Sequence, residues 1–178
     1  MEPKLDEKDL AILALLQKNC RLTARDIARK VNSPITTVFA KIKRMQKLGV
    51  IKAYKAILDS KKLGNATTAF ILVSVSYRTK NDGELISQRE IANEIVKFPE
   101  VQETHIITGD WDLLIKLKAE DVDAVGKFII DRLRFIKGIE KTLTCMVFET
   151  CKETTEIQIS AKKKSDKSYE EIIKKLKR

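Results

Sequence analysis

The chain has 178 residues, of which 43% are apolar and 34% charged. It shows no signal-peptide pattern, and no apolar run approaches the roughly 18 residues of a membrane span. We therefore expect a soluble, cytoplasmic protein of one or two domains. Three cysteines without paired spacing argue against disulfides and are expected to be small buried thiols. The net charge of +10 is carried by residues 1–60 and 161–178, whereas residues 61–160 are nearly neutral, which suggests a polyanion partner for the basic ends.

Two helices are predicted at the start of the chain. In the first, LDEKDLAILALLQKN, Asp6 is a candidate N-cap with Asp9 three residues later, and in the second, RLTARDIARKVN, Thr23 and Asp26 stand in the same relation. This spacing is that of a capping box, in which each acidic or hydroxyl side chain accepts a backbone N–H at the helix start.

A third helix is predicted between Ser33, as its N-cap, and Gly49, with Pro34 in the first helical position. Its apolar residues share one face, which we expect to pack on the first two helices: Ile35, Val38, Ile42 and Met45. The remaining polar face suits a DNA major groove and its phosphates, although any surface helix exposes lysines and threonines. The candidate DNA-binding residues are Ser33, Thr36, Thr37, Ala40, Lys41, Lys43, Arg44 and Lys47.

Two short helices separated by three residues after a supporting helix form a helix-turn-helix. The motifs of residues 5–59 resemble the winged helix-turn-helix head of the Lrp/AsnC (feast/famine) transcription regulators. The matching residues are Leu5-Asp6, Asp9, Ile12-Leu13, Arg21, Ser33, Thr37-Val38, Met45 and Gly49-Val50-Ile51. The family usually has arginine just before the isoleucine of the third helix, where this chain has Ala40-Lys41. Because lysine cannot fork onto a guanine or a phosphate as arginine does, the target sequence cannot be inferred from the family.

The segment VIKAYKAILD after Gly49 is predicted to be a strand, and the resemblance implies that it serves as a hinge that pairs with a partner subunit. Beyond residue 60 the alternation of apolar residues predicts strands over 67–78, 101–108, 112–120 and 139–150, with helices between the first and second and between the third and fourth. The order βαββαβ is the ferredoxin-like arrangement, with both helices on one face of an antiparallel sheet. We expect self-association to cover the other face.

The central hairpin reads Thr108-Gly109-Asp110-Trp111-Asp112, which resembles the most recognisable motif of the Lrp/AsnC effector domain. The resemblance implies a small-molecule site around this hairpin, between neighbouring dimers. A glycine turn lets backbone amides approach a carboxylate, and the aspartates can meet an ammonium group, but turn formation alone also explains "GD". The candidate effector-binding residues are Thr108, Gly109, Asp110, Trp111, Asp112 and Tyr77. Trp111 equally suits an interface.

The fold class is therefore predicted as α+β, with a DNA-binding domain over 1–60, a ligand-binding and oligomerisation domain over 61–155, and a basic extension over 156–178. We expect ETTEIQIS to add a short strand, and the last residues to form either a short amphipathic helix or a solvated extension. His105, the single histidine, is expected at an interface or pocket edge. A metal site is disfavoured, because neither a second histidine nor a cysteine lies near it in the sequence.

Three functions follow from this pattern. The leading one is a DNA-binding transcriptional regulator, a homodimer assembling to a tetramer or octamer, whose operator affinity responds to an amino acid or related metabolite. The alternative is an architectural DNA-coating protein of low sequence specificity without an effector. An enzyme is disfavoured, because the sequence has no nucleophile–base set, phosphate loop or metal cluster, and no cofactor is expected. The pattern specifies neither the ligand, the operator nor the sign of regulation.

Overall fold

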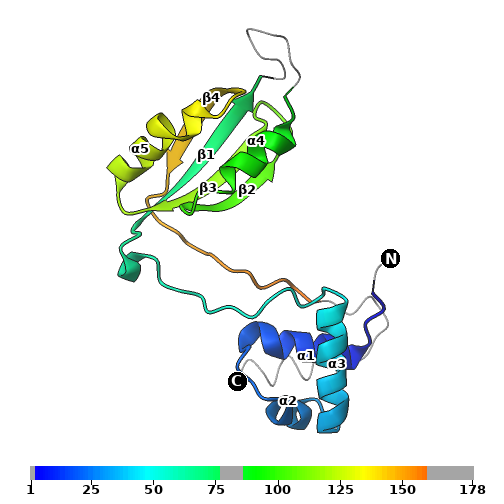
Figure 1. Cartoon of the computed structure of the whole chain (residues 1–178). Helices are drawn as coiled ribbons and strands as arrows, with labels where there is room; N and C mark the ends of the chain where they lie inside the picture. The colour runs from blue at the N-terminus through cyan, green and yellow to red at the C-terminus, as the bar shows by residue number, and fades with distance from the viewer. Residues whose placement is uncertain (1–2, 77–85, 160–178) are drawn as a thin grey trace. The chain divides into compact units, whose positions relative to one another are not determined.

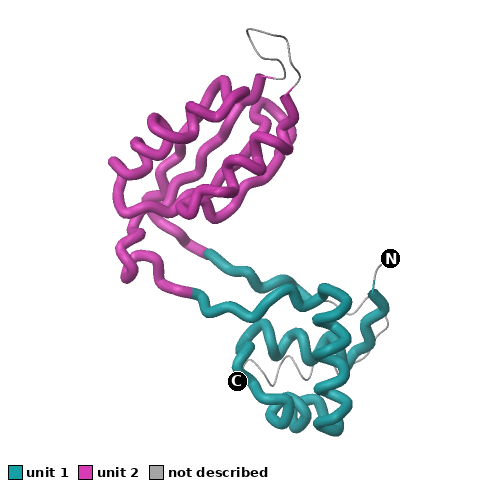
Figure 2. The backbone as a smooth tube through the Cα atoms, viewed as in Figure 1, with its two compact units in different colours: residues 1–57, 153–178 teal, residues 58–152 magenta. Residues whose placement is uncertain are grey.

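A computed structural model of the chain describes residues 3–76 and 86–159 (Figure 1). The described residues form two compact units (Figure 2). The head unit contains the residues up to Ile57 together with those from Glu153 onward, and the body unit runs from Leu58 to Lys152. Tyr77 and the predicted helix after residue 160 lie outside the described residues.

The head unit is built on three helices, α1 (Glu7–Lys18), α2 (Ala24–Lys30) and α3 (Ile35–Lys47). Both predicted capping boxes are confirmed, with Asp6 and Thr23 as the N-caps of α1 and α2. The predicted N-cap of α3 is wrong by one residue: Pro34 occupies that position in an extended conformation and provides no side-chain cap. Ser33 instead accepts a hydrogen bond from the Lys8 ammonium group at 3.1 Å through its hydroxyl.

The core of the head lies between the three helices. From α3, Val38 and Met45 are fully buried and Ile42 packs against the same cluster, as the apolar spacing predicts. Ile35 is an exception, because it is 47% exposed and does not belong to the core. It is the first residue of α3, one turn before the buried part of the stripe begins at Val38.

Two predicted strands, the one after Gly49 and the one that would extend the body sheet, are absent among the described residues of this chain. After α3, Gly49 turns the backbone at φ +69°, and residues 51–59 then run without strand pairing. Residues 153–159 are likewise irregular, so ETTEIQIS does not extend the sheet. A strand exists only through hydrogen bonds to a neighbouring strand, and neither segment has such a neighbour within the described part of this chain.

The body unit is a four-stranded antiparallel sheet with the order β2-β3-β1-β4. Its elements are β1 (Thr67–Val75), α4 (Gln88–Ile95), β2 (Val101–Ile106), β3 (Leu113–Ala119), α5 (Val122–Asp131) and β4 (Ile139–Met146), with short 3₁₀ turns at Lys61–Leu63 and Leu133–Phe135. Both helices lie on one face of the sheet (Figure 1). This is the ferredoxin-like fold that the order of elements predicts.

The alternation of buried and partly exposed residues along the strands defines the core of the body unit. On β1 and β3 every second residue is buried against the helices, as at Ile71 and Ile115. Val96 and Val122, at the ends of α4 and α5, are more than half exposed and lie outside this core. Phe128 of α5 is buried, and its ring packs edge-on against Phe98 at 5.4 Å between centroids. An aromatic pair therefore anchors α5 to the chain that follows α4.

The other face of the sheet carries an apolar row. Leu72 on β1 is paired with Leu114 on one side and Leu143 on the other. Leu72 and Leu114 are half-buried and Leu143 is exposed. Helices cover only the opposite face, so this row is the part of the described sheet that a second copy can cover.

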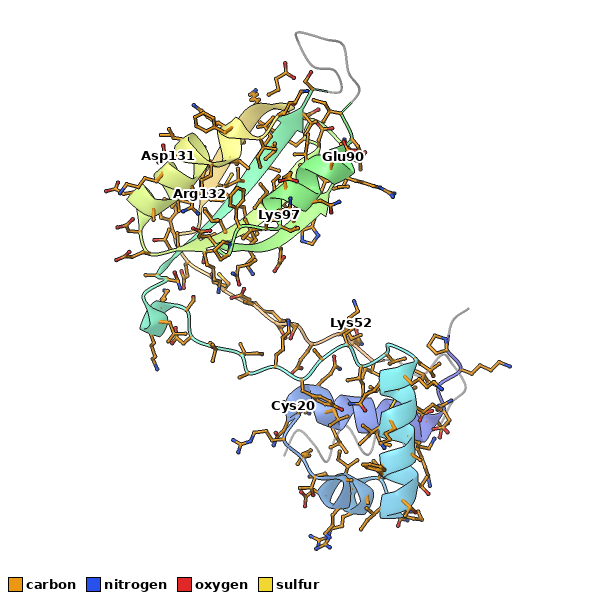
Figure 3. All side chains as sticks on the ribbon, in the orientation of Figure 1. Cys20, Lys52, Glu90, Lys97, Asp131 and Arg132 are labelled. Carbon is orange, nitrogen blue, oxygen red and sulfur yellow. The ribbon has the colours of Figure 1, made fainter. Side chains whose placement is uncertain are left out.

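The three cysteines differ from the expectation of buried thiols, since Cys20, Cys145 and Cys151 are all free and exposed. Figure 3 labels Cys20 just after α1. Cys145 belongs to β4, and its alternation with half-buried neighbours places it on the face of the sheet away from the helices. Among the described residues no helix is long and apolar enough to cross a membrane.

Candidate nucleic-acid interface and ligand hairpin

The outward face of α3 is polar and basic. Thr36, Ala40, Lys43 and Lys47 are exposed along it, at spacings of four, three and four residues that place them on one side of the helix. Within the described residues neither Lys43 nor Lys47 makes an ion pair with a carboxylate. Thr37 is half-buried at the edge of this face. The face therefore offers two unpaired cations beside small polar side chains, the composition that fits a major groove and its phosphates.

A buried ion cluster holds the adjacent flank of α3 against α1. The Asp9 side chain is fully buried, and its two oxygens meet Lys41 Nζ at 3.1 Å and Arg44 Nη2 at 2.5 Å. Lys41 also contacts the Asp6 carboxylate. The Asp9 carboxylate further accepts the Asp6 backbone N–H at 2.9 Å and so closes the capping box of α1. A single aspartate thus connects the N-terminus of α1 to α3.

This cluster sets Lys41 apart from the other candidate DNA-binding residues. Its side chain is only 17% exposed and its ammonium group faces two carboxylates, because position 41 lies on the side of α3 that turns toward α1. Lys41 is therefore a structural cation and not part of the outward face. Arg44 belongs to the cluster but still reaches the surface. Its side chain is 46% exposed, and it also donates to the Lys4 carbonyl at 3.4 Å.

The ionisation of the cluster follows from its contacts. Burial raises the pKa of Asp6, but hydrogen bonds from Lys41 and from the Asp9 backbone, with the Lys41 charge, outweigh it and leave that pKa below its usual value. Burial lowers the pKa of Lys41, but hydrogen bonds to Asp6 and Asp9 outweigh it and leave that pKa above its usual value. Both groups are therefore held in their charged forms near neutral pH.

One exposed residue of α3 was left unassigned by sequence reasoning. Phe39 is 53% exposed, and Lys43 Nζ lies 4.8 Å from the centroid of its ring, within the range of a cation–π contact. Phe39 lies four residues after Ile35 and three before Ile42, so helical spacing places it beside the apolar stripe of α3. The spacing therefore did not indicate that the ring is exposed.

The hairpin between β2 and β3 brings the five motif residues together. Gly109 adopts φ +116°, a conformation that favours glycine, and Thr108 and Asp110 are exposed. The Trp111 ring faces Lys141 Nζ at 5.3 Å from its centroid. The turn therefore presents its backbone and the exposed side chain of Asp110.

Asp112 has a structural task in the same hairpin. Its carboxylate accepts the backbone N–H of Val75 at 2.7 Å and the side-chain amide of Gln88 at 2.7 Å. Its backbone bonds to Val73 and to Ile107. Asp112 thus ties the hairpin to the end of β1 and the start of α4.

His105 lies on the outer strand β2 and is exposed. Its Nε2 is 3.3 Å from the Glu103 carboxylate, which Lys116 Nζ also approaches at 3.3 Å. The hydrogen bond from His105 and the contacts of Lys116 hold the pKa of Glu103 below its usual value, against the opposing effect of burial. No group of histidine, cysteine and acidic residues able to hold a metal ion exists in the described ranges.

Comparison with known proteins agrees with this architecture. Residues 5–52 match the family model of a winged helix-turn-helix DNA-binding domain, and residues 68–157 match that of the Lrp/AsnC ligand binding domain. The chain belongs to the Lrp/AsnC family. This Lrp/AsnC protein is accordingly a transcriptional regulator with a DNA-binding and a ligand-binding domain, and not an enzyme.

Two relatives and two solved structures illustrate the likeness. An uncharacterized HTH-type transcriptional regulator of Pyrococcus furiosus is 40% identical over 86% of this chain and 99% of its own length, and the regulator FL11 of Pyrococcus horikoshii is 33% identical over 89% and 99%. A Neisseria meningitidis regulator crystallised with L-Met superposes with a TM-score of 0.79 at 26% identity, over 87% of this chain and 97% of that one. For E. coli AsnC the TM-score is 0.76 at 22% identity, over 86% and 99%, a likeness of fold.

Proposed function

We propose that this Lrp/AsnC protein is a sequence-specific regulator whose assembly and operator affinity respond to an amino acid or a related small metabolite. The outward face of α3 carries the proposal. Its threonines and alanine fit the floor of a major groove, and its lysines, which have no carboxylate partner among the described residues, fit the flanking phosphates. The proposed DNA contacts are Ser33, Thr36, Thr37, Ala40, Lys43 and Lys47, with Arg44 contributing through its exposed part.

The buried cluster supports this function by fixing α3, the helix proposed to recognise DNA and called the recognition helix below. Asp9 neutralises two cations of α3 on the flank that faces α1, so the remaining positive charge is directed outward. A helix held by ion pairs and by the buried Val38 and Met45 presents its outward side chains in one orientation. Preorganisation of this kind lowers the cost of ordering a binding surface.

Self-association is supported by the leucine row on the open face of the sheet. We propose that Leu72, Leu114 and Leu143 are covered in a dimer that assembles further to a tetramer or octamer. Two heads would then meet two half-sites of one operator, spaced by about one helical turn, roughly 34 Å.

The effector part rests on the hairpin of residues 108–112. Gly109 leaves the backbone amides open to a carboxylate, and exposed Asp110 suits an ammonium group. Asp112 contributes by holding the turn. The similar Neisseria meningitidis regulator was crystallised with L-Met, which supports an amino acid as the class of ligand. Tyr77 stays a proposed contact that lies outside the described residues.

DNA binding is tested by selecting duplexes from a random pool with the full chain and comparing their Kd with that of an unrelated duplex. We expect the selected sequences to bind at least tenfold more tightly, and Lys47→Gln to weaken both duplexes equally while lowering the salt slope by about one phosphate contact. Equal affinity for all duplexes would contradict sequence specificity.

The effector is tested by thermal shift with each amino acid, using wild type and Asp110→Asn. We expect one compound to raise the Tm of the wild type and to lose most of this effect in the variant. Asp112 is unsuitable for this test, because its replacement disturbs the hairpin itself. A shift that is equal in both proteins would contradict the role of Asp110.

One observation favours an architectural DNA-coating protein as a second candidate. The position at which the family usually has an arginine is Lys41 here, and its ammonium group is engaged with Asp6 and Asp9. The chain therefore has fewer groups for reading bases. Footprints that spread along any DNA, together with no thermal shift from any amino acid, would support this candidate.

A further inference from the structure

Phe39 exposes apolar surface on the recognition helix. Its side chain is 53% exposed, and Ile35, one turn earlier, is 47% exposed. Neither belongs to the core of the head, although aromatic side chains normally contribute a large share of a core. The helix thus carries apolar surface beside the polar residues that are proposed to face DNA.

The position of Phe39 on α3 places it at the rim of that outward face. At 100° per residue it lies roughly 60° around the helix axis from Thr36 and roughly 40° from Lys43. The ion cluster with α1 occupies the opposite flank, through Lys41 and Arg44. Phe39 is therefore not part of this ion cluster, nor does it belong to the apolar core of the head.

The surroundings of the ring indicate what it meets. Lys43 Nζ lies 4.8 Å from the ring centroid, so the aromatic face and an ammonium group form one unit. An apolar protein surface covering the ring would also have to desolvate that charge, which costs free energy. A DNA groove instead offers phosphates to the ammonium group and one apolar group to the ring, the C5-methyl group of thymine.

We propose that Phe39 contacts the C5-methyl group of a thymine in the major groove, while Lys43 contacts a neighbouring phosphate. This inference rests on the proposed function. Of the four bases only thymine carries this methyl group, so the contact selects one base at one position of each half-site. Apolar contact needs no hydrogen-bond donor. The contact therefore gives this chain a means of base selection that does not depend on the arginine missing before Ile42.

The test replaces thymidine by deoxyuridine, which lacks only the methyl group, at each position of a duplex selected by the full chain. We expect the Kd of the wild type to rise about fourfold at one position per half-site, the effect of losing one buried methyl group. Phe39→Ser should bind the thymidine duplex more weakly and should show no further loss with deoxyuridine. Phe39→Leu should keep part of the discrimination, because leucine still offers apolar contact.

Lys47→Gln is the matched control, since it changes the same face without changing the ring. It should weaken binding to both duplexes equally and keep the thymidine preference. Equal affinity of the wild type for all substituted duplexes, or an unchanged preference in Phe39→Ser, would overturn the inference while leaving DNA binding intact. A change in the mass of the DNA-free assembly in Phe39→Ser would also overturn it, by marking Phe39 as a subunit contact. Absence of any DNA binding would remove the proposed function itself.

Discussion

Asp9 shows how a single side chain can connect two helices. It is fully buried, yet a carboxylate is tolerated there because Lys41, Arg44 and the Asp6 N–H satisfy its oxygens. Burying a charge without partners costs several kcal/mol, and removing one partner of a buried pair strands the other. The connection between α1 and α3 therefore depends on this residue.

We expect Asp9→Ala to lower the free energy of unfolding of the head by about 2 kcal/mol, because Lys41 keeps only Asp6 and the capping box of α1 is lost. Urea unfolding of the full chain, followed by circular dichroism, measures the change. Glu7→Ala is the matched control, an exposed acidic residue of the same helix, and should change stability by less than about 0.5 kcal/mol. Equal losses in the two variants would contradict the role of the cluster.

The same cluster predicts how stability depends on pH. The pKa of Lys41 is raised in the folded chain, so its stabilisation is fully present below the unfolded value of 10.5 and is lost as the pH rises through the folded pKa. The pKa of Asp6 is lowered, so its stabilisation is present above the unfolded value of 3.8 and is lost as the pH falls through the folded pKa.

Lys41→Met tests both ends of this profile, because the variant lacks the charge that perturbs Asp6. We expect its Tm to lie below that of the wild type at neutral pH, and the difference to shrink as the pH rises above 10.5 through the folded pKa of Lys41 and as it falls below 3.8 through the folded pKa of Asp6. Thermal unfolding across this range measures it. A difference that stays constant with pH would mean that packing of the lysine stem, and not its charge, stabilises the head.

Among the elements, the β2–β3 hairpin contains two aspartates with different surroundings. Asp112 holds the turn through hydrogen bonds, whereas Asp110 is exposed. We expect Asp112→Ala to destabilise the body by about 2 kcal/mol, because the buried Val75 N–H and the Gln88 amide lose a charged acceptor. Asp110→Ala, two residues away and exposed, should cost less than about 0.5 kcal/mol. Urea unfolding compares them, and an equal cost would assign no special task to Asp112.

The elements that could be predicted from the sequence are those whose signals are local. Capping boxes at Asp6 and Thr23 and the alternation along β1 and β3 depend on neighbours within a few residues, and the structure confirms them. The strand predicted after Gly49 required a partner that the local pattern does not specify. The ion pair of Lys41 with Asp9 also joins distant parts of the sequence, because Asp9 lies 32 positions earlier. A helical wheel gives the direction of the Lys41 side chain but does not show which residue lies there.

At the scale of the whole molecule, the chain passes between its two units twice. It leaves the head after Ile57 and returns at Glu153. The returning segment is attached to α1, where the Gln17 side chain accepts the Ile157 N–H at 2.9 Å and donates to the Ile157 carbonyl at 3.1 Å. One amide group thus satisfies both backbone groups of a residue 140 positions later. This contact holds Ile157, near the end of the described residues, against α1.

We expect Gln17→Ala to release this segment without unfolding the head, because the bonds are exposed and Ile157 is not part of the apolar core. Each such bond contributes about 0.5 kcal/mol net, so amide hydrogen exchange at Ile157 should accelerate about fivefold. Gln17→Glu keeps the acceptor and loses the donor, and should give a smaller acceleration. Gln46→Ala, an exposed residue of α3, should leave exchange at Ile157 unchanged. If Gln17→Ala also left it unchanged, the segment would be held by something other than this amide.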